Sequence, residues 1–264
     1  MKTIASLFLC LLGACSWVRA DGCSLRVMAY NVKHGHGMDG RVDIARAAQV
    51  IRTRSPDLVA LQEIDVGVDR SGRVDQPAEL GRLTGMHHAF GKFLDYGGGD
   101  YGLAILSRFP ITEVRRIVLP DGRHEPRSAL LVRVDPPGFS LPVDFVCVHL
   151  DWLQDDTRRF AQAHELHAAL GATPHPVIVA GDFNDRPESR TMRFVFGEYQ
   201  SVPKPAGGRF TFPADAPVRE IDYVVVRSNV PWSGSCRVVD EPLVSDHRPI
   251  VAELTFDRSV STLR

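Results

Sequence analysis

The chain lacks the features that mark a membrane-spanning body, a disulfide scaffold or a common zinc enzyme. Its 264 residues hold only five cysteines, with no CxxC pair and no HExxH motif. After the first twenty residues, no apolar run reaches membrane-spanning length. The formal net charge is −1, which disfavours a broadly basic nucleic-acid binder but leaves a local basic patch open. No internal repeat or linker-like composition change divides the chain.

The start of the chain resembles a secretory signal peptide. A positive residue precedes the apolar run 4–12, and Val18-Arg19-Ala20 offers a small-x-small cleavage site. The alternative is a lipoprotein signal, because the residues that end at Cys15 resemble a lipobox. We therefore expect an exported protein, periplasmic or secreted. In it residues 1–20 are the signal peptide and 21–264 form one domain, with a lipid anchor at Cys15 as the alternative.

Three cysteines, Cys23, Cys147 and Cys236, remain after this leader. Because three is odd, at least one of them has no disulfide partner within the chain. Cys147 lies in the apolar run 143–148, which predicts a buried, inert thiol. An exported protein could carry a bridge between Cys23 and Cys236, and the sequence leaves that pairing open.

The hydrophobic pattern alternates between the periods of strands and helices. A strand is predicted up to Asn31, and helices are predicted from Ile44 to Ser55 and from Thr157 to Leu170. Further strands are predicted at 58–61, 102–107, 111–118, 128–134, 143–149, 176–181, 221–227 and 249–255. Many strands with few helices predict an α/β protein whose sheets pack face to face with helices outside.

Reactive polar residues stand at the ends of these predicted strands. Earlier strands finish at Asn31, at Gln62-Glu63, at His149 and at Gly181-Asp182-Phe183-Asn184, whereas later strands are preceded by Asp222 and by Ser245-Asp246-His247. If the later strands run antiparallel to the earlier ones, all these groups meet at one edge of the sheets. The sequence therefore predicts a site of carboxylates, amides and two imidazoles.

These residue types together favour one kind of chemistry. The oxygens of Glu63 and Asn31 are hard ligands that suit Mg²⁺ or Mn²⁺ better than zinc or copper. Histidines beside carboxylates can take a proton from water and protonate a leaving oxygen. Asp182 and Asn184 are suited to orient that water. A hard cation, a base and an acid indicate attack of water on a phosphate ester.

At these positions the sequence resembles the endonuclease/exonuclease/phosphatase superfamily. The matching motifs, in the family's order, are Tyr30-Asn31-Val32, Leu61-Gln62-Glu63, Ala104-Ile105-Leu106-Ser107-Arg108, Val148-His149-Leu150, Gly181-Asp182-Phe183-Asn184, Glu220-Ile221-Asp222-Tyr223 and Ser245-Asp246-His247-Arg248-Pro249. The resemblance covers essentially the whole chain after the leader. It implies a four-layer α/β sandwich, in which two mixed sheets pack between helices, and a metal-dependent phosphohydrolase domain at 21–264.

The resemblance also implies a role for each matched residue. His247 is the base that activates water, Asp222 the carboxylate that orients it, and His149 the histidine at the phosphate or the leaving group; Asp182 and Asn184 position water and a phosphate oxygen; Glu63, Asn31 and Asp246 hold the metal; and Arg127 faces the phosphate.

One position departs from the family pattern. Lys33 stands where the abasic-site endonucleases of this superfamily carry an acidic metal ligand. This disfavours a DNA-repair enzyme and leaves open whether one or two metal ions bind. Mg²⁺ is the expected cofactor, with Mn²⁺ or Ca²⁺ as alternatives.

Several functions stay open within this chemistry. We expect an exported phosphodiesterase; the alternatives are a nuclease acting on DNA or RNA, a lipid- or GPI-related phosphoesterase, and a family member that has lost catalysis and only binds a ligand. The presence of Glu63, Asp182 and His247 favours the enzyme. The balanced charge disfavours tracking of duplex DNA. We expect a monomer whose partner is a phosphoester substrate of unknown identity.

Some aromatic and histidine positions have ordinary structural explanations. Trp152 and Trp232 are expected to pack in the core, with a place at a substrate mouth as the alternative. The run His34-Gly35-His36-Gly37 resembles a metal cluster, but its glycines favour a loop near that mouth.

Overall fold

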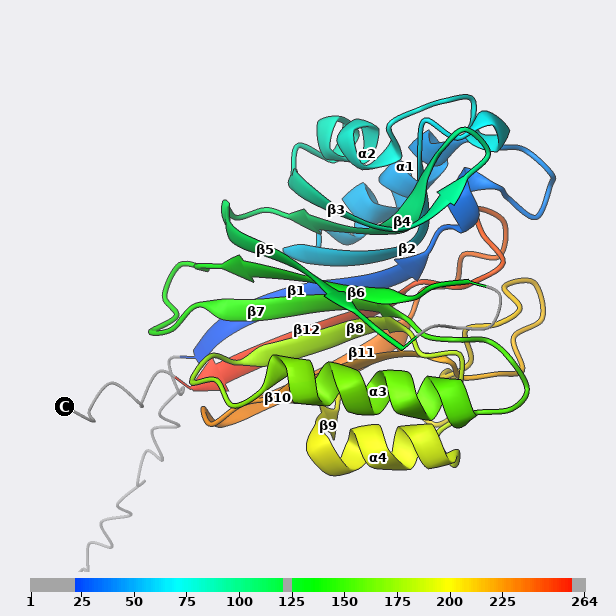
Figure 1. Ribbon diagram of the computed structural model, residues 1–264. Coiled ribbons are helices and arrows are strands. Elements are labelled where there is room, and N and C mark those ends of the chain that lie inside the picture. The colour runs from blue at the N-terminus through cyan, green and yellow to red at the C-terminus, as the bar shows by residue number, and fades with distance from the viewer. Residues whose placement is uncertain (1–21, 121–124, 258–264) are drawn as a thin grey trace, which may run out of the picture.

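Two mixed β-sheets of six strands each pack face to face, with helices on the outside of both (Figure 1). This arrangement, seen in a computed structural model that describes residues 22–120 and 125–257, is the predicted four-layer α/β sandwich. The predicted signal peptide and Cys15 lie outside the described residues. Within the described residues, no helix has the length and apolar character needed to cross a membrane.

The first sheet has the strand order β11-β12-β1-β2-β4-β3. Its strands are β1 (Gly22–Asn31), β2 (Leu58–Val66), β3 (His87–Tyr96), β4 (Gly99–Ser107), β11 (Trp232–Val238) and β12 (Ile250–Asp257). β1 pairs in parallel with β2 and antiparallel with β12. Helices α1 (Ile44–Arg54) and α2 (Gln76–Thr84) cover its outer face (Figure 1).

The second sheet has the strand order β5-β6-β7-β8-β10-β9. Its strands are β5 (Ile111–Val118), β6 (Ser128–Val134), β7 (Val143–His149), β8 (Val177–Asp182), β9 (Gln200–Ser201) and β10 (Asp222–Arg227). Helices α3 (Thr157–Leu170) and α4 (Arg190–Glu198) cover its outer face (Figure 1). β5, β6, β7 and α3 have the predicted bounds, whereas β3, β9, β11, α2 and α4 were not predicted.

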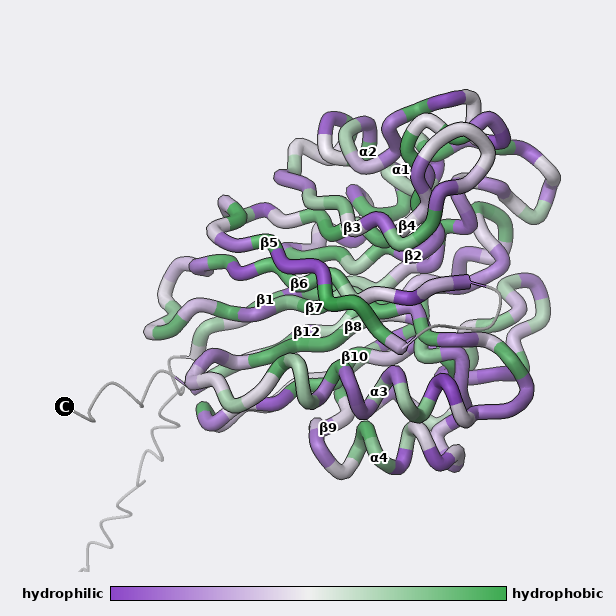
Figure 2. Tube along the Cα trace, in the orientation of Figure 1, coloured by the Kyte–Doolittle hydropathy of each residue, from purple (hydrophilic) through white to green (hydrophobic). Residues whose placement is uncertain are grey.

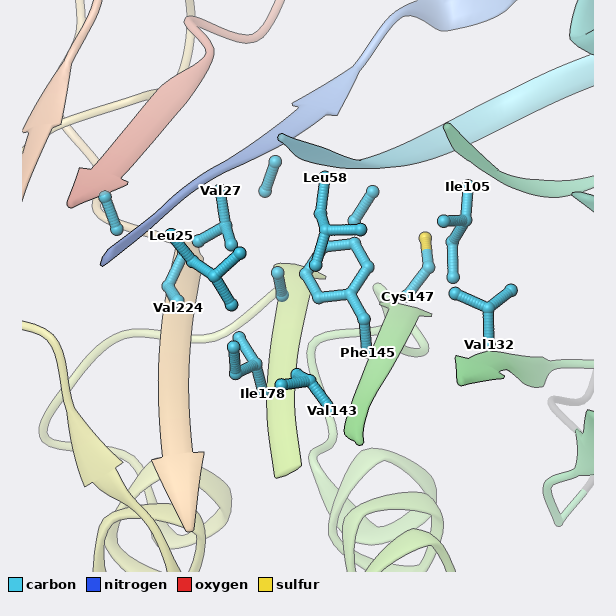
Figure 3. Packing of buried hydrophobic residues seen from close by; sticks show 14 of the residues in the cluster. Leu25, Val27, Leu58, Ile105, Val132, Val143, Phe145, Cys147, Ile178 and Val224 are labelled. Carbon is cyan, nitrogen blue, oxygen red and sulfur yellow. The ribbon is translucent and has the colours of Figure 1, made fainter. Parts of the chain in front are cut away.

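The main hydrophobic core lies between the two sheets, where side chains from their inner faces interdigitate (Figure 3). Leu58 of the first sheet and Phe145 and Ile178 of the second are fully buried there. Apolar residues follow the paired strands, and hydrophilic residues gather on loops and outer helix faces (Figure 2). Burial of this apolar surface is the main favourable term in folding. The site described below is therefore built on a rigid base.

The three cysteines of the described chain are buried, and the open question of a bridge is answered by register. Cys23 lies opposite Phe256 on β12, whereas Cys236 lies opposite Ala252. Four residues along a strand span about 13 Å, beyond the reach of a disulfide. The thiol of Cys23 instead donates a hydrogen bond to the carbonyl of Gly138 at 2.6 Å.

Cys147 lies in the core between the sheets, as predicted. It is fully buried, and its sulfur accepts a hydrogen bond from Nε2 of Gln62 at 3.1 Å. Burial raises the pKa of the Cys147 thiol to about 12. The thiol is therefore protonated at neutral pH and inert as a nucleophile.

Gly181 is the position in β8 where a side chain is least tolerated. Its φ is +147°, and a Cβ there would lie 2.1 Å from the carbonyl oxygen of Val148 on β7. The oxygen belongs to a neighbouring strand, so it cannot move aside without disturbing the pairing that carries Asp182.

We expect Gly181→Ala to lower the free energy of unfolding by about 2–4 kcal/mol, because the new Cβ meets backbone. Gly197→Ala in α4 is the matched control, since a Cβ at Gly197 meets nothing within 4 Å and alanine favours helix. Urea unfolding measures both variants. Equal midpoints for the two would show that β7 and β8 adapt without cost.

Candidate active site

The polar side chains predicted from the sequence lie together at one edge of the sandwich. β1, β2, β7 and β8 end at this edge and β10 and β12 begin there, because β10 is antiparallel to β8 and β12 to β1. The edge lies away from Gly22 and Asp257, on the right in Figure 1. Strand register alone sets His149 opposite Asp182, and Asp182 opposite Asp222. The expected convergence is therefore present.

The side-chain amide of Asn31 connects the two sheets. Its Nδ2 lies 3.0 Å from Oε1 of Glu63 and 3.3 Å from Oδ2 of Asp182. Its Oδ1 accepts a hydrogen bond from the backbone N–H of Lys33 at 3.1 Å. The hydroxyl of Ser245 donates to the backbone carbonyl of Asn31 at 2.7 Å. One buried residue thus ties β1 to β2, to β8 and to the loop before β12.

Glu63 occupies an irregular position in β2. The β2–β4 register shifts between Leu61 and Ile64, and Glu63 has a φ of +60°. Such a bulge re-aims a side chain out of the strand's alternation. Burial raises the pKa of Glu63, while the hydrogen bond from Asn31 opposes that rise. Because Asn31 is a neutral donor, it does not balance the negative charge of Glu63.

His247 bridges two buried carboxylates. Its Nδ1 lies 3.0 Å from Oδ2 of Asp222, and its Nε2 lies 3.6 Å from Oδ2 of Asp182. The ring of Phe212 packs against the imidazole with centroids 4.9 Å apart. Burial alone would lower the pKa of His247, but Asp222 and then Asp182 outweigh it and raise that pKa to about 10. Burial raises the pKa of Asp182 to about 7.

His149 is a second histidine beside Asp182, and its pKa is shifted in the direction opposite to that of His247. Its Nε2 is 3.6 Å from Oδ2 of Asp182. Burial, together with the positive charges of Arg127 and His247, holds the pKa of His149 well below its ordinary value. Its buried Nδ1 has no hydrogen-bond partner among the described residues. At neutral pH the site therefore combines one neutral and one charged imidazole.

Asn184 is held by the turn that follows β8. Its backbone N–H donates to Oδ1 of Asp182 at 2.8 Å, and its Nδ2 donates to the carbonyl of Leu150 at 3.0 Å. The φ of Asn184 is +53°, a conformation that asparagine tolerates better than most residues. Asn184 is thus fixed beside Asp182, as its motif predicts.

Arg127 is a buried cation with donors to spare. Its side chain is 1% exposed, and Nη2 lies 2.9 Å from Oε2 of Glu125. The guanidinium stacks over the ring of Phe93, 5.5 Å from its centroid. Nε and Nη1 are buried with no hydrogen-bond partner among the described residues. A guanidinium with unpartnered N–H groups is suited to bind an anionic oxygen.

Two contacts of the site were not predicted. The ammonium of Lys33 lies 2.8 Å from Oδ2 of Asp246, the residue that the motif predicts as a metal ligand. Phe212, which packs on His247, comes from the long loop between β9 and β10. Neither contact has a local sequence signal, since each joins residues far apart in the chain.

Two sets of side chains could hold a metal ion. Ligand atoms of Asp182, Asp222 and His247 lie within 4.8 Å of one another, but there a cation would compete with the imidazole proton that these carboxylates already hold. Glu63 offers carboxylate oxygens that make no ion pair among the described residues, although the charges of His247 and Arg127 act on it from a distance. The amide oxygen of Asn31 accepts one hydrogen bond, from the N–H of Lys33, and keeps a second lone pair. A half-buried carboxylate beside a carboxamide oxygen fits a hard divalent ion.

Exposed apolar side chains surround this edge. Most of the large exposed apolar residues in the described chain lie on loops or strand ends here: Met38, Val42, Val74, Tyr96, Trp152, Phe210, Val218 and Leu243. Trp152 is 60% exposed, so the expectation that it packs in the core is wrong. Its position on the loop that follows β7 places it on the side of the sandwich where the site lies. Trp232 is half-buried and packs against the core, as expected.

The fold and the site have the features expected of one protein family, and sequence comparison identifies the same family. The sequence profile of the Endonuclease/Exonuclease/phosphatase family matches residues 28–247, and the chain belongs to that family. It is 29% identical over 248 residues to the uncharacterized protein YbhP of Escherichia coli K12, covering 88% of this chain and 96% of YbhP.

Solved structures give the same architecture. The endonuclease/exonuclease/phosphatase protein of Beutenbergia cavernae matches with a TM-score of 0.69 at 25% identity, over 89% of this chain and 72% of that one. The Bacteroides vulgatus protein of the same family matches with a TM-score of 0.72 at 18% identity, over 89% of this chain and 100% of that one. The predicted family and fold are confirmed, and the chain has the fold of a phosphohydrolase with a candidate metal site.

The contrast between the two histidines gives a direct prediction for the metal-free protein. NMR titration of the imidazoles should find His247 protonated through neutral pH and His149 neutral there. Asp222→Asn should lower the pKa of His247 by about 1–3, because it removes the nearer of two negative charges. If both rings titrate together near the ordinary histidine value, the electrostatic description of this cluster is wrong.

Proposed function

We propose that the protein is a metal-dependent phosphodiesterase in which water attacks phosphorus. The observation that carries this proposal is the meeting, at one edge, of three different groups. Glu63 is a half-buried carboxylate that makes no ion pair among the described residues. His247 is an imidazole held by two carboxylates. Arg127 is a buried guanidinium, two of whose nitrogens have no hydrogen-bond partner in the described part of the chain. They supply a cation site, a proton-transfer group and an anion site.

Glu63 and Asn31 are proposed to hold the cation, Mg²⁺ first, with Mn²⁺ or Ca²⁺ as alternatives. When bound, such an ion polarises a phosphate oxygen and balances negative charge. Arg127 binds another phosphate oxygen through its free N–H groups. Asp182 and Asn184, which are hydrogen-bonded to each other, orient the attacking water beside His247.

His247 is proposed to take the proton of that water at Nε2, while Asp222 fixes the proton on Nδ1. Only the neutral imidazole can accept a proton, and Asp222 and Asp182 favour the charged form. The active fraction of enzyme therefore grows as pH rises toward the pKa of His247. Neutral His149 is proposed to contact the phosphate or the leaving oxygen.

The apolar side chains around the site favour a lipid phosphoester over a nucleic acid. Proteins that follow a nucleic-acid backbone need clustered Lys and Arg, whereas Trp152, Tyr96 and Leu243 expose apolar surface here. A substrate with an apolar body could lie on these side chains while its phosphate reaches Arg127. A purely ligand-binding protein would not need the complete set of proton-transfer groups.

A panel of phosphoesters tests this function. We expect hydrolysis of phospholipid vesicles in preference to plasmid DNA, RNA or inositol phosphates, dependent on Mg²⁺ or Mn²⁺ and abolished by EDTA. Glu63→Gln should weaken cation binding at least about tenfold with an unchanged fold, because it removes the charge and keeps the shape. Calorimetric titration with Mn²⁺ measures that affinity.

Glu253→Gln is the matched control, because Glu253 is exposed on β12, where it pairs with Arg26. Its cation affinity and turnover should equal those of the wild type. Full turnover by metal-free protein in excess EDTA would contradict the proposed function. An unchanged Mn²⁺ affinity in Glu63→Gln would move the cation site elsewhere.

Kinetics test the base. His247→Ala should lower kcat by about 10²–10⁴-fold, the usual contribution of general-base catalysis. In the wild type kcat should rise with pH up to the pKa of His247. Asp222→Asn should lower that pKa and move the rising limb to lower pH, while reducing kcat.

The two losses should not add, since Asp222 acts through His247. His164→Ala, an exposed histidine on α3, is the control and should keep the wild-type profile. Strictly additive effects of the two site substitutions would separate Asp222 from His247. A near-native kcat in His247→Ala would remove His247 from the mechanism.

A further inference from the structure

Lys33 is hydrogen-bonded to Asn31, the residue whose amide oxygen is proposed to bind the cation. It lies two residues beyond Asn31, with a φ of +46°, and its backbone N–H donates to Oδ1 of Asn31 at 3.1 Å. The left-handed conformation turns the chain immediately after β1. Both the direction of Lys33 and the orientation of the Asn31 amide are set by this turn.

The side chain of Lys33 reaches across to the loop before β12. Its Nζ lies 2.8 Å from Oδ2 of Asp246, and the two side chains are 34% and 22% exposed. The hydroxyl of Ser245 lies 3.4 Å from the other oxygen, Oδ1. Asp246 is near enough to Glu63 for its charge to raise the pKa of that carboxyl. A positive charge therefore stands within the electrostatic reach of the proposed cation site.

The charges at this edge can be paired one by one. Four carboxylates meet there, on Glu63, Asp182, Asp222 and Asp246. The imidazolium of His247 lies between Asp182 and Asp222, and the ammonium of Lys33 pairs with Asp246. Glu63 accepts a hydrogen bond from the neutral amide of Asn31 and has no ion-pair partner in the described part of the chain, while the charges of His247 and Arg127 act on it only from a distance. Of these four carboxylates, Glu63 is thus the one without a direct cationic partner.

We propose that the Lys33 ammonium is a fixed counter-cation that takes the place of a second metal ion, so that this site binds a single divalent ion at Glu63 and Asn31. The proposal rests on the proposed function for the presence of that first ion. A second ion at Asp246 would have to displace an ammonium that is already 2.8 Å from its carboxylate. Two positive charges so close together in a partly buried site repel each other strongly.

The count of bound ions tests this proposal without any assay of turnover. Mn²⁺ alone is the probe, and calorimetric titration and elemental analysis after gel filtration give the stoichiometry. The wild type and Lys33→Arg, which keeps the charge, should each bind one ion. Lys33→Glu should bind two, because it replaces the ammonium with a further oxygen ligand beside Asp246.

A double variant locates the second ion. Lys33→Glu combined with Asp246→Asn should bind one ion again if the gained site uses Asp246. Lys33→Met, which removes the charge without adding a ligand, should bind Mn²⁺ at least about tenfold more tightly than the wild type. Circular dichroism and thermal unfolding establish that each variant is folded, and Lys33→Met carries the test if Lys33→Glu does not fold.

The outcomes separate the two proposals. Two ions in the wild type overturn the role of Lys33 and leave the phosphodiesterase proposal intact. No ion in the wild type overturns both. One ion with wild-type affinity in Lys33→Glu and Lys33→Met also overturns the role of Lys33, as does a second ion that persists when Asp246→Asn is added.

Discussion

The hydrogen bonds of the Asn31 side chain are the contacts on which the rest of the site depends. Apolar packing between two sheets is not directional, so it does not by itself fix how the sheets align at their edges. Hydrogen bonds from Asn31 help to fix that alignment, because its amide nitrogen donates to Glu63 of its own sheet and to Asp182 of the other. Ser245 adds a third connection to the same residue. Loss of the amide would leave buried Asp182 and half-buried Glu63 without their shared donor, and an unsatisfied buried acceptor costs desolvation energy.

Several carboxylates lie together at this edge, buried or half-buried, and they have different partners. The imidazolium of His247 lies between Asp182 and Asp222, the ammonium of Lys33 pairs with Asp246, and Glu63 is the proposed ligand of an ion from solution. Buried ionised groups are costly unless paired. The kind of partner then matters for chemistry: a proton can be given up, an ammonium cannot easily, and a bound ion can exchange. In the proposed mechanism, this division separates the group that transfers protons from the groups that fix charge.

The strands and their shared edge could be predicted from sequence because both follow from local rules. Apolar runs end at polar residues, and antiparallel pairing brings the ends of β8 and the start of β10 together. Helix α2 was missed although its signals are present: Asp75 accepts a hydrogen bond from the N–H of Ala78, and Gly85 ends the helix in the left-handed conformation. Strand β11 has no comparable signal, since its serine and glycine residues become a strand only by pairing with β12.

The site was predictable residue by residue but not in its electrostatics. Motifs identified which side chains meet, yet the ion pair of Lys33 with Asp246 and the ring of Phe212 on His247 arise from long-range contacts that no local pattern encodes. Trp152 was expected in the core because tryptophan usually packs there. A short loop after β7 leaves it exposed instead.

This difference between strands and loops bears on how such a site can change. His149, Asp182 and Asp222 are fixed by β-ladder register, so moving any of them would shift a whole strand and turn its core side chains toward solvent. Lys33 begins a short 3₁₀ turn (Lys33–Gly35) and Trp152 and Leu243 lie on loops, all outside the β-ladders. Substitution at these positions does not require the core to repack, and under the proposed role of Lys33 it would alter the number of bound ions. In the proposed mechanism, the sandwich thus holds the groups that transfer protons, while the less constrained segments determine which substrate reaches them and how its charge is balanced.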